Sequence, residues 1–289
     1  MGEPVTGTQE RLSLMWLCRS FRLFKPICPN VRREIGQYLG SLYRYIPQIT
    51  GNSLSIYDSK TSTTTKSSLS LTFSYSSVFV LIHTSRILCL HPVGPQTDIY
   101  ILDTPSPILQ LQGSLAALRS YPGLINVAGD VYVFGGQKLK TAERLRVAYK
   151  EWKSLPDMQH VRSGFMPCCA GRDIHLPSAT SSQVLWEVWD VSKQEYRSIE
   201  KPLIPGIYDN SVSFLAGWDL IVVSAQKKIG KFSLKSGICT HLSCIVLARC
   251  EDAMSNLAPV QIDRSIYWVT LSGGLMTYSL DSGLVVYVA

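Results

Sequence analysis

The sequence predicts an all-β fold, a six-bladed β-propeller of four-stranded blades, and three observations lead to this prediction. Of the 289 residues, 46% are hydrophobic and 17% are charged, so the chain can bury a substantial core. Short apolar runs that end in a turn residue recur at nearly constant spacing, and each period holds four runs of strand-like composition. One four-stranded sheet of this size cannot bury both of its faces, so we expect the sheets to stack around an axis.

The period is clearest at one apolar run, which occurs six times. The last positions of these runs are separated by 45, 46, 41, 45 and 46 residues. They are Asp58, Asp103, Tyr149, Asp190, Lys235 and Asp281. Repeats of this length and regularity predict blades, one for each period.

The later five periods each divide into four expected strands, because runs of β-branched, aromatic and aliphatic residues alternate with Gly, Pro, Asp or Ser. In chain order the expected strands are Val78–Ile82, Arg86–His91, Asp98–Asp103 and Ile108–Gln112; Gly123–Val127, Val131–Phe134, Glu143–Tyr149 and Trp152–Leu155; Phe165–Ala170, Asp173–Leu176, Leu185–Val191 and Glu195–Ile199; Val212–Ala216, Asp219–Ser224, Lys228–Leu234 and Ile238–Leu242; Val260–Asp263, Ser265–Leu271, Leu275–Leu280 and Leu284–Val288.

The first period is less complete. Arg44–Ile49, Ser53–Asp58 and Leu69–Phe73 are expected to be its second, third and fourth strands, with the Ser- and Thr-rich segment Ser59–Ser68 as a hairpin between the last two. Leu39–Tyr43 is one choice for a first strand; the alternative is a ring closed by an incomplete blade. Upstream, apolar residues recur at helical spacing after Asn30. We therefore expect residues 1–43 to be a basic, helical N-terminal extension and residues 44–289 to be the propeller.

The second full period contains a recognisable motif. The segment Gly129–Phe134 runs into Gly135 and Gly136, and Tyr149, Trp152 and the segment Leu155–Met158 follow. This pattern resembles the kelch repeat, in which an apolar second strand ends in a glycine pair and a Tyr and a Trp follow at set intervals. The resemblance implies a structural role for all four residues: the glycines permit positive φ and close backbone approach, and the aromatic side chains pack between blades.

Net charge and cysteine content indicate which partners and which cellular compartment to expect. The formal net charge is +7, and the first 50 residues contribute seven basic against three acidic residues, so the propeller segment is only mildly basic. It lacks a nucleic-acid recognition motif, and we expect no nucleic-acid partner. The eight cysteines show no zinc-site spacing and are interpreted as reduced thiols. Because the apolar stretch Leu12–Cys18 is too short for a membrane span, we expect a cytoplasmic protein without stable membrane insertion.

Motifs that carry catalysis are missing from the sequence. The five histidines are scattered, and no H-E-x-x-H, G-x-S-x-G or phosphate-binding loop occurs. We therefore expect no catalytic residues, no metal site, no cofactor and no enzymatic activity. The alternative is a cryptic propeller enzyme similar to galactose oxidase, which shares the kelch-type fold and uses copper with a Tyr and a Cys.

Propellers of the kelch type bind proteins through loops at one face, so the resemblance implies an interaction scaffold. By that analogy the residues expected to contact a partner are basic and lie in the loops between second and third strands and in the segments between blades. They are Arg119, Lys138, Lys140, Arg162, Lys227 and Lys228. They are suited to an acidic motif through charge-assisted hydrogen bonds, or they are simply solvated loop charges. The sequence leaves the partner's identity and the oligomeric state open.

Overall fold

The computed structural model describes most of the chain from Tyr45 onward, and every regular element in the described part is a β-strand. The description omits residues 1–44, 59–60, 62, 75, 84, 105–106, 116, 180–183, 200–210, 217–218, 225–228, 235–238, 243–258, 263–264, 270–274, 283–284 and 288–289. The expected N-terminal extension, residues 1–43, and the proposed first strand Leu39–Tyr43 lie outside the described residues.

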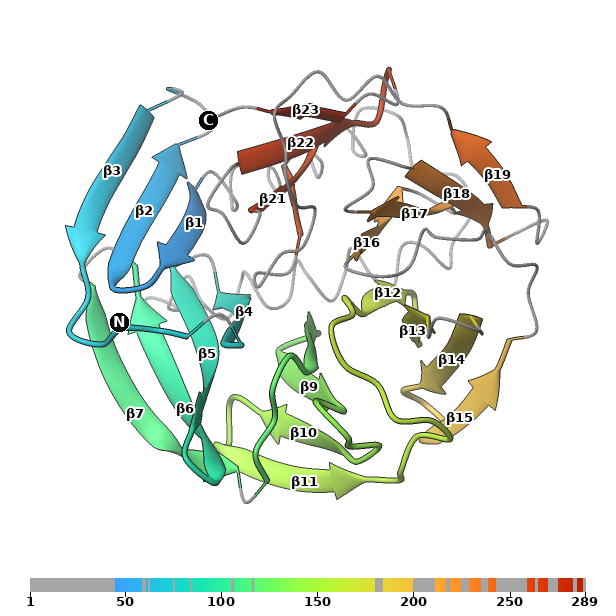
Figure 1. Ribbon diagram of the computed structural model, residues 1–289, viewed down its shortest axis with the longest axis horizontal. Helices are drawn as coiled ribbons and strands as arrows, with labels where there is room; N and C mark the ends of the chain where they lie inside the picture. Colours follow the sequence, from blue (N-terminus) through green and yellow to red (C-terminus); the bar gives the residue numbers. More distant parts are fainter. Residues whose placement is uncertain are drawn as a thin grey trace, which may run out of the picture.

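The strands form antiparallel sheets that follow one another around an axis, which is the arrangement of a β-propeller (Figure 1). A three-stranded sheet is followed by five four-stranded blades, each in simple chain order. The strands are β1 (Tyr45–Thr50), β2 (Ser53–Asp58) and β3 (Thr63–Ser68); β4 (Val78–His83), β5 (Arg86–Val93), β6 (Gln96–Asp103) and β7 (Ile108–Leu115); β8 (Gly123–Val127), β9 (Asp130–Phe134), β10 (Ala142–Arg146) and β11 (Glu151–Leu155); β12 (Cys168–Ala170), β13 (Asp173–Ala179), β14 (Val184–Asp190) and β15 (Glu195–Ser198); β16 (Ser211–Ala216), β17 (Asp219–Ser224), β18 (Ile229–Ser233) and β19 (Cys239–Leu242); β20 (Val260–Ile262), β21 (Ser265–Val269), β22 (Leu275–Ser279) and β23 (Val285–Tyr287).

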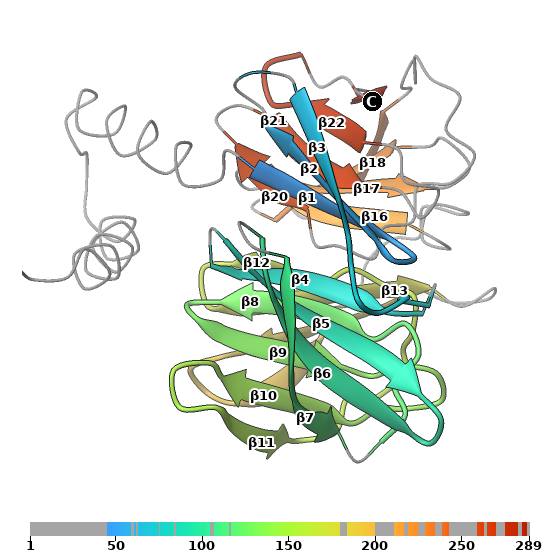
Figure 2. The ribbon, with the colours of Figure 1, turned by 90° about the vertical axis from the view of Figure 1, so that its left-hand side faces the viewer.

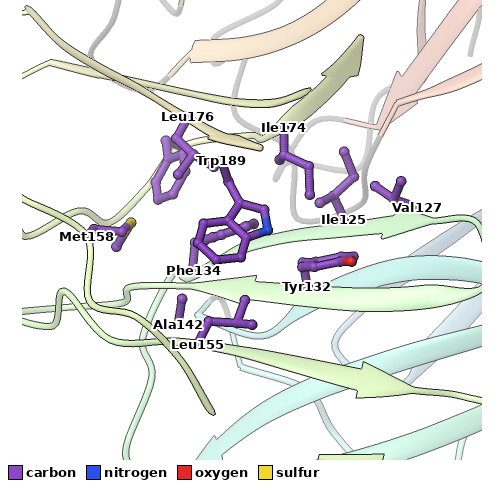
Figure 3. Close-up of a cluster of buried hydrophobic side chains, with 11 residues drawn as sticks. Ile125, Val127, Tyr132, Phe134, Ala142, Leu155, Met158, Ile174, Leu176 and Trp189 are labelled. Carbon is purple, nitrogen blue, oxygen red and sulfur yellow. The ribbon is translucent and has the colours of Figure 1, made fainter. Parts of the chain in front are cut away.

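The core lies between the sheets, so the middle strands are buried on both faces. In β9, for example, four consecutive residues from Val131 to Phe134 are buried, and so are Ile87–His91 in β5. Such strands read as continuous apolar runs because a neighbouring blade covers each of their faces. In the interface between β8–β11 and β12–β15, the indole of Trp189 lies among Phe134, Leu176 and Met158 (Figure 3).

Each neighbouring pair of sheets shares a buried cluster, including the pair at which the ring closes. Ile46 of β1 and Leu275 of β22 are both buried there, with Tyr57 and Tyr267 packed against them. The sheet β1–β3 also shares a larger cluster with β4–β7 that includes Leu54 and Ile87. Figure 2 shows this sheet in blue, above the strands β4–β7. The first and last parts of the described chain therefore meet through apolar packing.

Most expected strands are present with shifted ends, and two differ in substance. The outer strand of the first sheet is β3, which lies within the segment expected to be a hairpin; Leu69 and Phe73, at the ends of the strand expected there, are buried outside any strand. The β-branched threonines pair with β2, and the apolar pair fills the adjoining core instead. The strand expected to end at Tyr149 ends at Arg146, because residues 147–150 form the turn to β11 and Lys150 has a positive φ of 54°.

Candidate functional site

The two ends of the propeller differ in their connections. Turns between first and second strands and between third and fourth strands lie at one end, which we call the hairpin face. Loops between second and third strands and the segments that join blades lie at the other, which we call the loop face. This division follows from the antiparallel order of strands in every blade. Four of the basic residues predicted to bind a partner belong to described segments of the loop face: Arg119, Lys138, Lys140 and Arg162.

The loop-face segments of two neighbouring blades are tied together by backbone hydrogen bonds. The amide of Gln137 donates to the carbonyl of Ser120 at 2.9 Å, and the amide of Gly164 donates to the carbonyl of Tyr121 at 2.9 Å. The amide of Met158 also donates to the carbonyl of Lys140 at 2.8 Å. Each loop is therefore held by another loop as well as by its own strands. Side chains carried by these segments are presented on a well-supported surface.

Arg119 was expected to face solvent, but its side chain is buried, with 1% exposed. Its guanidinium forms an ion pair with Glu143 of β10 at 2.7 Å, donates to the Thr141 hydroxyl at 2.9 Å and donates to the carbonyl of Gly135. An acidic partner would have to displace these groups and enter the protein. We therefore correct the expectation that Arg119 receives a partner and interpret it as a side chain that supports the loop.

Arg162 repeats this arrangement one blade later. Its side chain is fully buried, pairs with Glu187 of β14 at 2.7 Å and donates to the carbonyl of Leu176 at 2.8 Å. Burial lowers the pKa of the Arg162 guanidinium and the Glu187 carboxylate opposes that shift. The correction made for Arg119 therefore applies to Arg162: its charge is already neutralised inside the fold.

The glycine pair lies where the arginine segments approach the second strand. Gly135 and Gly136 have φ of 63° and 116°, a region that side-chain-bearing residues rarely adopt. A Cβ atom at Gly135 would overlap the carbonyl oxygen of Arg162, and one at Gly136 would lie 3.1 Å from Cα of Arg119. The glycines thus leave room for the backbone that carries both buried arginines.

The two aromatic residues of the kelch-like motif have different surroundings. Trp152 of β11 is half-buried against the cluster between β4–β7 and β8–β11. Tyr149, which was expected to pack between blades, lies in a turn of the hairpin face and is 76% exposed. Because the turn begins after Arg146, the phenol ring points away from the core. The packing role expected for Tyr149 is therefore corrected.

The expected lysines divide between the described and undescribed parts of the chain. Lys138 and Lys140 are exposed on the loop face; Lys140 lies 3.8 Å from Asp157 in a solvent-exposed pair. Lys138 adopts a left-handed φ of 63°. Lys227 and Lys228 lie outside the described residues.

Three exposed apolar side chains of the loop face were not singled out from the sequence. Leu118, Tyr121 and Val161 are 41%, 37% and 52% exposed, and we call them the apolar patch. Leu118 and Val161 each directly precede a buried arginine. In extended backbone neighbouring side chains point in opposite directions, so an inward arginine turns its neighbour outward. This relation to the repeated arginine is the signal that could have identified them.

Tyr121 has an unusual backbone conformation for an aromatic residue. Its φ is 53°, in the left-handed region, where a large side chain costs about 1–2 kcal/mol. The conformation is held by hydrogen bonds on both sides of the residue. The Tyr121 amide donates to the carbonyl of Ser76 at 3.4 Å, and the Tyr121 carbonyl accepts from the amide of Gly164. Backbone strain of this kind concentrates at functional sites.

A Ser–His pair occurs in the neighbouring blade, and its surroundings bear on the enzyme alternative. The hydroxyl of Ser77 lies 2.8 Å from Nδ1 of His91. Both residues are buried, with Ser77 wholly inaccessible, and the ring of Phe73 packs edge-on against the imidazole. A substrate could not reach this hydroxyl without local opening. We interpret the pair as a satisfied polar contact of the core.

Three further findings concern the class of site. Within the described residues, no cluster of three or more His, Cys, Asp or Glu side chains is placed to hold a metal ion. The same part of the chain contains no helix with the length and apolar character needed to cross a membrane. Compared with protein-family models and with curated proteins, the chain gives no match.

Proposed function

We infer that the chain is a six-bladed propeller of the kelch type and a non-enzymatic scaffold that binds another protein through its loop face. The six-blade count is supported by the cluster around Ile46 and Leu275, through which the three-stranded sheet joins the last blade. The kelch type is supported by the glycine pair beside the buried arginine segments. The observation that carries the function is the apolar patch on hydrogen-bonded, partly strained loops.

The apolar patch suits a protein partner for two physical reasons. Exposed apolar side chains on a supported loop lose little conformational entropy when they are covered, so their burial yields net affinity. Tyrosine, the residue type of Tyr121, is enriched at the centres of protein interfaces, because its ring is large and has few rotatable bonds. Lys138 and Lys140 lie in the β9–β10 loop, which is hydrogen-bonded to both segments that carry the patch, so the surface fits a segment that combines apolar and acidic side chains.

The test is selection of peptides from a displayed library of natural protein segments, followed by affinity measurement with the purified full chain. Leu118→Ser and Val161→Ser are expected to weaken binding of the selected peptides about tenfold each, the usual effect of removing an apolar anchor. Lys138→Glu is expected to weaken binding of the acidic peptides, most strongly at low salt, and to reduce the gain in affinity that the unmodified chain shows when salt is lowered. Tyr149→Ser, which removes a 76% exposed ring of the hairpin face, is the control and should bind like the unmodified chain.

The outcome that would contradict the proposal is equally specific. Peptides whose binding is lost with Tyr149→Ser and kept with Leu118→Ser and Val161→Ser would place the binding site on the hairpin face. A chain that selects no peptide and instead binds stoichiometric copper would favour the galactose-oxidase-like alternative.

A further inference from the structure

Within the described part of the chain, the outer strand β7 leaves a long sheet edge unpaired. It is the fourth strand of its blade, and among the described strands it pairs with β6 alone. Figure 1 shows it at the rim of the ring, away from the axis. The outward amide and carbonyl groups of such a strand are ready to pair with another extended chain.

The side chains of β7 include none of the charged groups that prevent an edge strand from pairing. Proteins commonly protect an edge strand with charged residues. Among the outer strands whose side-chain exposure the structure describes, β3 carries Lys66, β11 carries Glu151 and Lys153, and β15 carries Glu195 and Arg197. By contrast, β7 has eight residues, more than any of these, and no charge. Its Ile108 and Leu111 are 55% and 59% exposed.

The geometry of β7 limits how far a new strand can extend along it. A register shift between β6 and β7 leaves Gln112 as an extra residue, because Ile99 pairs with Gly113 while Tyr100 pairs with Leu111. Such a bulge disturbs the ladder and twists the edge. At the other end Pro107 has no amide hydrogen to donate. The regular edge is therefore Ile108–Leu111, whose centre is formed by Leu109 and Gln110.

We propose that β7 pairs antiparallel with β7 of a second copy of this chain, about a twofold axis that passes midway between the two copies of Gln110. In a twofold antiparallel pair, residues directly opposite must point to the same side of the sheet, so the axis lies between two copies of the same residue. With the axis at Gln110, Leu109 lies opposite Leu111 of the second copy, and the two Gln110 side chains face each other. At the three central positions leucine lies opposite leucine and amide opposite amide, and no charge lies opposite its like; Ile108 lies opposite Gln112 of the bulge.

The same features favour a second copy over an unrelated strand. The segment Leu109–Leu111 is complementary to itself about the twofold, and the uncharged edge supplies no ion pair by which a different strand could be selected. A twofold contact also closes on itself, so it yields a dimer rather than a growing fibre. The contact is independent of the loop face, which stays open in both copies.

The test is sedimentation equilibrium of the full chain over concentrations that bracket the micromolar range typical of small interfaces. The unmodified chain is expected to form a dimer. Gln110→Lys places two like charges opposite each other across the axis and should raise the dissociation constant about tenfold or more. Ser154→Lys, on the exposed outer strand β11, is the matched control and should leave the dimer unchanged.

A mixing experiment separates a specific register from a general loss of folding. Gln110→Lys and Gln110→Glu are each expected to be monomeric alone and to associate when mixed, because the mixed pair places opposite charges across the axis. Thermal unfolding of each variant verifies that it is folded. A monomeric unmodified chain, or a dimer that persists in both variants, would overturn the proposal; variants that stay monomeric on mixing would overturn the register at Gln110.

Discussion

The loop face and the hairpin face are built from the same alternating strands, yet they place ion pairs differently. On the hairpin face, Arg197 pairs with Asp173 at 2.6 Å while half of its side chain stays in water. On the loop face, Arg162 pairs with Glu187 at a similar distance with both side chains almost fully buried. Exposed pairs contribute little to stability, whereas a buried pair is costly to break because the remaining charge stays in the interior. The comparison shows that burial, and not distance, decides what an ion pair does.

The largest expected effect comes from removing one member of the buried pair. Glu187→Ala leaves the Arg162 guanidinium buried without its counter-charge, and it also removes the acceptor of the Gln159 amide at 2.7 Å. We expect the free energy of unfolding to fall by about 3–5 kcal/mol. Urea unfolding monitored by tryptophan fluorescence measures it.

Two matched variants calibrate this loss. Glu143→Ala removes the partner of Arg119, but the Glu143 side chain is 20% exposed and water can partly replace it, so the loss should be smaller, about 2 kcal/mol. Glu195→Ala breaks an exposed pair with Lys193 on the hairpin face and should cost less than about 1 kcal/mol. Equal losses for Glu187→Ala and Glu195→Ala would show that burial does not separate the two kinds of pair.

Between the two faces, protonation of a buried histidine should destabilise the fold, and His175 of β13 is the residue on which this can be measured. Burial lowers the pKa of His175 to about 4, with Asp173 opposing and Arg197 reinforcing the shift. The Nδ1 atom accepts a hydrogen bond from the indole of Trp186 at 3.3 Å, which requires an unprotonated Nδ1. The native state therefore binds fewer protons than the unfolded state between pH 6.5 and 4, and stability falls as pH decreases through this range.

The expected size is on the order of 3 kcal/mol between pH 7 and pH 4, from the difference between an ordinary histidine pKa and the lowered one. His175→Asn keeps an acceptor for Trp186 and removes the titrating group. The variant should therefore lose about 3 kcal/mol less stability than the unmodified chain between pH 7 and pH 4. The measurement is urea unfolding of both proteins at several pH values. Parallel curves for the two proteins would show that His175 is not the group responsible; His91, whose pKa burial also lowers, would be the next to replace.

Two glycines in the same backbone conformation, one on each face, allow the effect of steric crowding to be separated from that of backbone strain. Gly135 of the loop face and Gly171 of the hairpin face have φ of 63° and 67°. A Cβ at Gly171 would meet no atom within 4 Å, whereas one at Gly135 would overlap the Arg162 carbonyl. Alanine at either position is destabilised by the left-handed φ. The free energy of unfolding of Gly135→Ala should fall by about 2 kcal/mol more than that of Gly171→Ala, because of overpacking. Similar melting temperatures for the two variants would mean that the arginine segment can move away.

Much of the propeller is predictable because strand periodicity and turn residues are local signals. The expected Gly123–Val127 and Asp219–Ser224 coincide with β8 and β17, and both are apolar runs bounded by turn residues. The outer strand β3 was missed because its Thr- and Ser-rich sequence contributes to no core. An outer strand needs only pairing on one edge, so its composition resembles that of a loop.

The candidate site was harder to predict, since its key property is the direction in which side chains point. Arg119 and Arg162 read as exposed loop charges because their partners, Glu143 and Glu187, lie about 25 positions away in another blade segment. A sequence shows neither the pairing nor the burial that follows from it. The left-handed φ of Tyr121 is likewise imposed by the hydrogen bonds that its amide donates to Ser76 and its carbonyl accepts from Gly164, which no local propensity reveals.

The smallest expected effect concerns two lysines in the same backbone conformation on opposite faces. Lys138 of the loop face and Lys150 of the hairpin face have φ of 63° and 54°, and both are exposed. Glycine removes the left-handed cost but increases the freedom of the unfolded chain, so Lys138→Gly and Lys150→Gly should each raise stability by only about 0.5 kcal/mol.

Binding should separate these two variants where stability does not. Lys138→Gly removes a charge and loosens a loop next to the apolar patch, so acidic peptides selected by the unmodified chain should bind it several-fold more weakly. Lys150→Gly should bind them unchanged, because its charge lies at the opposite end of the propeller. Equal affinities for both variants, measured by fluorescence anisotropy at low salt, would remove Lys138 from the binding surface and leave the apolar patch to act without it.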